Sequence, residues 1–232
     1  MTAISVDAVP VHAIVQPQTV RLIPTRHFAP PVLGPLVDSA EEQGLLAELE
    51  GLTNRRLKAE RGNVPAIRRE ELVYDRAGQS YVNAAFAHSR AGGNRFNDEA
   101  RGAWYAGFDV RTALEEVAFH RTRELRYIDH FEDSCRYRAL HAAFIGRFHD
   151  LRGVEPRPAC LDADIAIGYP AGQELAKALI ERESRGLVYP SVRYGGGTCL
   201  VAFQPGVIQD VVPGAEWELS WEGSPDWKAV TV

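Results

Sequence analysis

Residues 92–123 constrain the chain most, because they place a loop, a strand and a helix next to one another with short connections. The paired glycines at the start loosen a loop that carries Arg95. The aromatic run WYAGF predicts a strand that carries Tyr105, and the helix that follows carries Glu115 and Glu116 in its first turn. A guanidinium, a phenol and a carboxylate from three consecutive elements predict a pocket for an anionic ligand with an acid beside it.

The start of this helix carries a local signal of its own. Thr112 followed three residues later by Glu115 has the pattern of a capping box, in which each side chain satisfies a free backbone N–H of the other residue. Ala113 and Ala118 then face the interior. If Glu115 serves the cap, Glu116 is the carboxylate left over for chemistry. The plainer alternative is that Glu116 is only an acid placed favourably near a helix N-terminus.

Composition limits the class of protein. A chain of 232 residues with 45% hydrophobic and 25% charged residues is long enough for a buried core and has ordinary globular values. The formal net charge of −5 argues against nucleic acid or an anionic membrane as a partner. Three cysteines without a CxxC pair make a disulfide framework improbable, and no signal peptide or membrane-spanning run is present. We therefore expect a soluble cytoplasmic protein.

No linker or compositional break divides the chain, so one domain over residues 1–232 is expected, with an extended or poorly ordered arm at 1–19 and an N-terminal elaboration at 20–90. Hydrophobic periodicity and turn residues predict further elements. The expected strands are 20–23, 139–151, 187–194 and 198–203, and the expected helices are 38–61, 69–73, 81–88 and 172–186, the last capped by Gly186.

Several common chemistries lack their motifs. The histidines have no partners at metal-ligand spacing and no HExxH or Cys/His cluster occurs, so no metal is expected. The sequence also lacks a GxSxG elbow and a GxxxxGK[ST] loop. The glycine triplet at 195–197 does not have the GxGxxG pattern, which makes a Rossmann dinucleotide fold improbable.

Four sequence blocks follow one another along the chain in this order: GGNRFN, WYAGFDVRTALEEVAFHR, DLRG and GLVYPSVRYGGGTCLVAFQP. Together, over residues 21–223, they resemble the RES-domain family, toxins of bacterial toxin–antitoxin pairs named after a recurring Arg, Glu and Ser. Block by block, these three residues fall on Arg95, Glu116 and Ser191, and a functional aromatic residue falls on Tyr105. The sequence departs from the family in the loop before Arg95, where an Asn interrupts the glycines, and in having fewer basic loop positions than some members.

The resemblance implies an α+β fold with an ADP-ribosyltransferase-like core of mixed or antiparallel sheets, and NAD as substrate. Glu116 would stabilise the oxocarbenium-like state that forms when the nicotinamide–ribose bond breaks. Arg95 would hold the diphosphate, Tyr105 would stack on nicotinamide or ribose, and Ser191 would donate to a phosphate or ribose oxygen. Arg26 is either a second phosphate contact or a surface arginine. The resemblance further implies a cognate antitoxin that covers the pocket entrance.

The acceptor of ADP-ribose stays open at this point. Water or phosphate would make the protein an NAD-depleting enzyme, whereas a side chain of a host protein would make it an ADP-ribosyltransferase. Many transferases that modify proteins carry a second acid two positions before the catalytic Glu, and here that position is Leu114. Two other classes remain as alternatives: a module that binds a nucleotide without turnover, and a protein-interaction module whose Arg, Tyr and Glu are structural.

Overall fold

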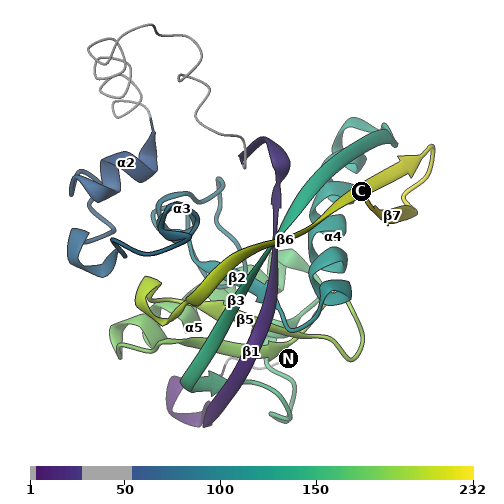
Figure 1. Ribbon diagram of the computed structural model, residues 1–232. Coiled ribbons are helices and arrows are strands. Elements are labelled where there is room, and N and C mark those ends of the chain that lie inside the picture. Colours follow the sequence, from purple (N-terminus) through teal and green to yellow (C-terminus); the bar gives the residue numbers. More distant parts are fainter. Residues whose placement is uncertain (1–3, 28–53) are drawn as a thin grey trace, which may run out of the picture.

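A long, strongly curved strand organises the computed structural model, which describes residues 4–27 and 54–232 (Figure 1). This strand, β3 (Glu132–Asp150), pairs antiparallel with β1 (Val11–Pro24) and β6 (Gln209–Glu222), and parallel with β4 (Gly186–Pro190). The remaining strands of the described chain are β2 (Trp104–Gly107), β5 (Thr198–Ala202) and β7 (Trp227–Thr231).

Together the strands form one seven-stranded sheet in the order β1-β2-β5-β4-β3-β6-β7, with an additional pairing between β1 and β3. That extra pairing closes the first five strands into a ring. The ring is held weakly at two places, because β1 meets β2 through a single residue pair and β4 meets β3 through two. All pairs except β3–β4 are antiparallel, so the α+β class with a mixed sheet is confirmed.

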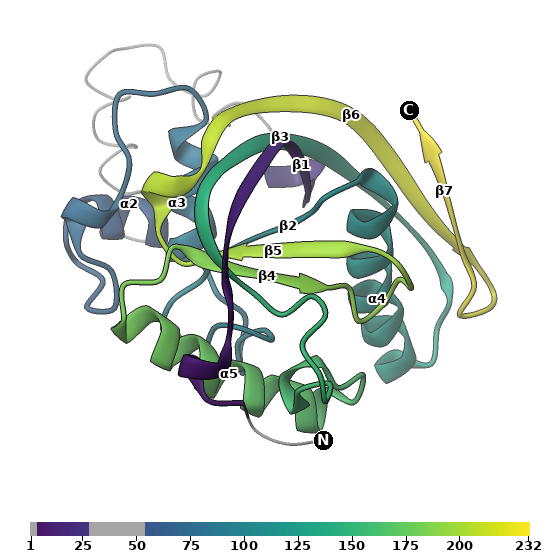
Figure 2. The same ribbon diagram turned by 90° about the horizontal axis from the view of Figure 1, so that it is seen from below.

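Helices cover the sheet on separate sides. The described helices are α2 (Arg55–Glu60), α3 (Gln79–Ala87), α4 (Val110–Ile128) and α5 (Ile165–Glu181). Short 3-10 turns include η1 (Val6–Ala8), η2 (Thr25–His27), η4 (Arg69–Glu71) and η5 (Ala159–Leu161). Figure 2 shows β1, β3 and β6 arching over β4 and β5, with α5 on the opposite side of those two strands. Alternation along β4 explains this arrangement, because Leu187 and Tyr189 pack with α5 whereas Val188 joins the core under the arch. Helix α4 packs its buried face against β1 and β6.

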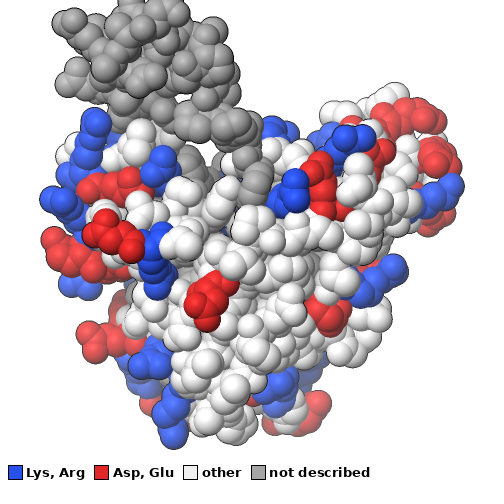
Figure 3. Space-filling model, viewed as in Figure 1, with Lys and Arg blue, Asp and Glu red and all other residues white. Residues whose placement is uncertain are grey.

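The outer face of the arch is poor in charge. Val15, Ile145 and Val212 are 74%, 52% and 51% exposed, and Figure 3 shows mostly uncharged side chains over β1, β3 and β6. Charged side chains gather around the edges of this view instead. Clusters of charge therefore lie on other parts of the molecule.

The predicted elements are mostly present but their bounds differ. The strand expected at 20–23 is only the end of β1, so residues 11–19 of the expected arm belong to the sheet, and β3 begins seven residues before the predicted 139. The helices near 69–73 and 81–88 correspond to η4 and α3; the helix expected at 38–61 lies largely outside the described residues, and only its end corresponds to α2. The cap predicted at Gly186 is wrong: α5 ends at Glu181, and Gly186 opens β4, where an added Cβ would lie 2.3 Å from the Val201 carbonyl oxygen.

Candidate functional site

Helix α4 begins earlier than its sequence suggests. Asp109 is the N-cap: its Oδ1 accepts the backbone N–H of Thr112 at 2.8 Å and its Oδ2 accepts the Thr112 hydroxyl at 2.8 Å. The predicted capping box of Thr112 with Glu115 is therefore wrong, since a carboxylate three residues upstream already takes the donors at the helix start. Glu115 instead pairs with Arg111 at 2.6 Å on the exposed side. Glu116 is still left without a role in the cap.

Glu116 is held by the connection between β4 and β5. The Ser191 hydroxyl donates to Glu116 Oε1 at 2.8 Å, and the Cys199 thiol lies 3.6 Å from the same oxygen. Ser191 Oγ in turn accepts the backbone N–H groups of Arg193 and Tyr194 at 3.2 and 3.1 Å. Burial and then the Glu116 carboxylate raise the pKa of the Cys199 thiol, which keeps its proton. Within the described chain only Oε1 is engaged, so the carboxylate is oriented while Oε2 stays available.

Arg95 is anchored by one of its three nitrogen atoms. Its Nη1 donates to the carbonyl oxygens of Cys160 and Asp162, in and just after η5, at 2.7 and 2.8 Å. Two glycines of α5 make room for it: a Cβ on Gly168 would lie 2.5 Å from Nη1, and one on Gly172 would lie 2.1 Å from the Arg95 carbonyl oxygen. No hydrogen bond from Nε or Nη2 to another described residue is present, so that edge of the guanidinium is open to a ligand.

Tyr105 supports the loop that carries Arg95. Its hydroxyl donates to Asn97 Oδ1 at 2.8 Å and accepts the backbone N–H of Phe96 at 3.0 Å, and burial raises the pKa of this phenol. The phenol thus fixes the residue that follows Arg95. Arg26 is different: it lies in the exposed turn η2, directs Nε toward His27 and has no contact with Arg95, Glu116 or Ser191. The structure therefore brings Glu116 and Ser191 into contact and does not bring Arg26 to them.

Three further arginines and a histidine border this region, and none of them was predicted from the sequence. Arg90 Nη1 lies 3.3 Å from His120 Nδ1, and the Arg193 guanidinium stacks 3.4 Å over the ring of Phe119. Burial, followed by Arg90, Arg123, Arg193 and Arg95, lowers the pKa of His120 to about 3. This group, which we call the arginine cluster, comprises Arg90, Arg95, Arg123 and Arg193 around His120.

The arginine cluster adjoins Glu116. Burial and then Arg95 lower the pKa of Arg193, while Glu116 raises it, so Arg193 is within electrostatic reach of both predicted site residues. A usable signal was present in the sequence, since positions 116, 119, 120 and 123 follow helical spacing and share one face of α4. The contribution of Arg193 from another part of the chain could not be found in that way.

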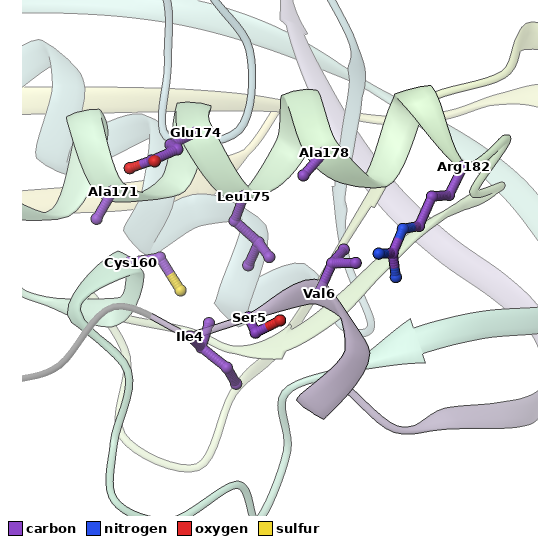
Figure 4. A pocket seen from close by; sticks show the side chains of 9 residues that line it. All are labelled: Ile4, Ser5, Val6, Cys160, Ala171, Glu174, Leu175, Ala178 and Arg182. Atoms are coloured by element: carbon purple, nitrogen blue, oxygen red, sulfur yellow. The ribbon is translucent and has the colours of Figure 1, made fainter.

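A separate cavity of about 290 Å³ lies beside η5, between the N-terminal segment and α5. Figure 4 shows it between the N-terminal segment with Ile4 and Val6 and the side chains of Leu175 and Arg182 at α5, with the Cys160 sulfur directed toward it. The same Cys160 contributes the carbonyl oxygen that holds Arg95. Glu116 and Ser191 do not line this cavity, so it is distinct from the candidate site.

The described residues contain no group of three or more His, Cys, Asp or Glu side chains suited to holding a metal ion. None of the helices the structure describes is long and apolar enough to cross a membrane.

Comparison with known proteins identifies the family. The RES domain model matches residues 72–222, which is more than half of the chain and includes every candidate site residue except Arg26. The chain therefore belongs to the RES domain family, and the resemblance of its four sequence blocks is confirmed. A search of solved structures finds similarity to a chain in the crystal structure of the M. tuberculosis MbcT–MbcA toxin–antitoxin complex, with 19% identity and a TM-score of 0.35, over 53% of this chain and 72% of that one. No curated protein matches the chain.

Proposed function

We propose that this RES-domain protein is the toxin of a toxin–antitoxin pair and an enzyme that consumes NAD by breaking the bond between nicotinamide and ribose. The observation that carries the proposal is a carboxylate, Glu116, fixed by Ser191 beside a cluster of arginines that form no ion pair with a carboxylate of the described residues. A dinucleotide needs both parts, because its diphosphate is anionic and its ribose becomes cationic as the glycosidic bond breaks.

The residues of the candidate site would have separate roles in this reaction. Glu116 stabilises the developing positive charge at the anomeric carbon and accepts a hydrogen bond from a ribose hydroxyl through Oε2. Ser191 and the protonated thiol of Cys199 orient that carboxylate through Oε1. Arg95 contributes its open edge to the diphosphate, and Tyr105 keeps the Arg95 loop in place.

The acceptor of ADP-ribose is the finer part of the proposal. Leu114, at the position where many protein-modifying transferases carry a second acid, is buried at 4% exposure, and Glu115 is paired with Arg111. Neither residue supplies a second carboxylate at the site, which disfavours arginine as the acceptor. Water, phosphate or another side chain of a host protein are the acceptors that fit, and we propose that a cognate antitoxin covers the entrance until the toxin acts in the cytoplasm.

The test is nicotinamide release from NAD by the wild-type protein and by Glu116→Gln. The amide keeps the size of the side chain and a hydrogen bond with Ser191, but it removes the negative charge. We expect release to fall roughly 100- to 1000-fold, as when one preorganised electrostatic partner is removed from an active site. Glu115→Gln, next in sequence but paired on the exposed side, is the matched control and should keep the wild-type rate.

The same measurements separate the alternative functions. A nucleotide-binding module would bind NAD while nicotinamide release stays at background in every variant. A protein-interaction module would show neither, and Glu116→Ala would lower its melting temperature, because Ser191 and Cys199 lose the oxygen to which they donate. A folded Glu116→Gln variant that cleaves NAD at the wild-type rate would show that Glu116 has been given the wrong role.

A further inference from the structure

One face of α4 joins the carboxylate to the arginine cluster. Glu116, His120 and Arg123 follow one another at four- and three-residue steps, so their side chains leave the helix on the same side. At 1.5 Å per residue, Arg123 lies about 10 Å further along the helix axis than Glu116. The face therefore runs from an acidic end at Glu116 to a basic end at Arg123.

The basic end carries hydrogen-bond donors that are buried without a partner. Nη2 of Arg193 and Nε of Arg123 are inaccessible to water and donate to no other described residue. Arg193 is otherwise fixed, since its Nη1 donates to the carbonyl oxygen of Ala163 at 2.9 Å and its plane lies on Phe119. Buried donors without acceptors cost free energy, so the described residues alone do not satisfy these two guanidinium groups. An anion would bind through their remaining nitrogen atoms, Nη1 and Nη2 of Arg123 and Nε of Arg193, which are not among these buried atoms without a partner.

His120 contributes one more donor. An arginine can only donate, so the 3.3 Å contact makes His120 Nδ1 the acceptor from Arg90 and leaves the ring proton on Nε2. The charged groups facing His120 are Arg90 and Arg95 from the loop, Arg123 from α4 and Arg193 from the β4–β5 connection. Burial and then these arginines lower the pKa of the ring and keep it neutral. A neutral imidazole with its proton on Nε2 can donate to a phosphate oxygen.

We infer that Arg123 and Arg193, with His120 beside them, bind the diphosphate of the dinucleotide, so that the substrate lies along α4 with its nicotinamide ribose at Glu116. This inference rests on the proposed function and adds positioning residues and an orientation to it. Charge supports it: the four guanidinium groups of the cluster and the carboxylate of Glu116 together leave three positive charges, and the two phosphates of a dinucleotide would neutralise two of them. Arg90 is the exposed member of the cluster.

The test uses ADP, which carries a diphosphate and no nicotinamide ribose, as the probe in calorimetric titrations. Arg123→Gln and Arg193→Gln should each weaken ADP binding roughly 10- to 100-fold, as expected for the loss of a hydrogen bond from a charged group. Arg126→Gln, an exposed arginine on the same helix, is the matched control and should bind as the wild type does. In NAD turnover the first two variants should raise KM far more than they lower kcat, whereas Glu116→Gln should lower kcat.

Two further measurements keep the inference open to refutation if a variant folds poorly. Arg123→Lys and Arg193→Lys keep the charge and should recover part of the lost affinity. Wild-type protein should bind ADP at least roughly 100-fold more tightly than adenosine, and inorganic pyrophosphate should compete with ADP. Equal affinity for ADP and adenosine, or unchanged ADP affinity in both Gln variants, would overturn the inference. Tight ADP binding with no nicotinamide release would leave the inference standing and refute the proposed enzyme.

Discussion

Two groups of arginines in this protein have opposite surroundings. At the end of β3, Arg152 donates to both carboxylate oxygens of Asp150 at 2.7 to 3.1 Å, and His12 approaches the same carboxylate at 3.2 Å. The arginine cluster beside Glu116 has no such partner: none of its members forms an ion pair with a carboxylate among residues 4–27 and 54–232. The charge of Arg152 is balanced by a carboxylate of the described protein, whereas the charges of the arginine cluster are not.

A shortage of acids does not explain the difference, because the chain has 31 acidic and 26 basic residues. Carboxylates pair with arginines across β3 and β6, where Arg136 meets Glu218 and Arg138 meets Glu216. Paired arginines such as Arg136 and Arg138 join two strands, whereas the arginines of the cluster are the ones that we propose bind an anion from outside. Variants of the two groups should therefore fail in different ways, the first in stability and the second in binding.

The largest effect on stability is expected for Asp150→Asn. Burial alone would raise the pKa of Asp150, but hydrogen bonds from Arg152 and His12 lower it, so the folded state favours the carboxylate. Replacing it leaves Arg152 without its counter-charge and should lower the free energy of unfolding by about 3 kcal/mol in urea titrations. In the wild type this contribution is present above the ordinary Asp pKa and is lost as pH falls through the lowered folded value.

Asp7→Asn serves as the control, because Asp7 is also bonded to an arginine, Arg182, but its side chain is 74% exposed. No measurable loss of stability is expected there. Equal losses for Asp7→Asn and Asp150→Asn would contradict the view that burial of the paired carboxylate decides the difference.

The fold could be predicted from the sequence wherever a strand or helix carries its own periodicity. The hairpin of β4 and β5, the helix α3 and the central strand β2 have such patterns. Strand β1 does not, because its pairing with β3 shifts register between Gln16 and Thr19, with Pro17 inside the irregularity. The first part of β3 alternates charged residues whose partners lie on β6, and only the folded sheet shows that these residues pair.

The candidate site likewise contains residues that could be predicted from the sequence and residues that could not. Glu116, Arg95 and Ser191 were found because they lie in blocks that resemble the RES family. The cap at Asp109 was missed because the capping-box pattern began at Thr112, three residues inside the true start. The arginine cluster was missed because its members come from the loop before β2, from α4 and from the β4–β5 connection, and no local pattern joins segments so far apart in sequence.

A smaller effect is expected from His120 when the pH is lowered. Its folded pKa of about 3 lies below the unfolded value of 6.5, so between these values only the unfolded state binds the extra proton. The free energy of unfolding therefore decreases as the pH is lowered through this range. At pH 5 this loss should reach at most about 2 kcal/mol, and His120→Gln should lack it. Thermal melts of both proteins between pH 7 and about 4.5 measure the difference, with exposed His130→Gln as control. Parallel pH profiles for wild type and His120→Gln would mean that burial and the neighbouring arginines do not lower the pKa of this ring.

The smallest effect on stability, and the sharpest contrast with Asp150→Asn, is expected for Arg123→Gln. Removing one of several neighbouring positive charges relieves repulsion and breaks no ion pair to a described residue, so the free energy of unfolding should change by less than about 1 kcal/mol and should rise, if it changes, at low salt. Added ADP should raise the melting temperature of the wild type and have little effect on the variant, because ligand binding stabilises only the protein that binds. A loss of stability as large as that of Asp150→Asn, with the response to ADP intact, would place Arg123 among the arginines that hold the fold together.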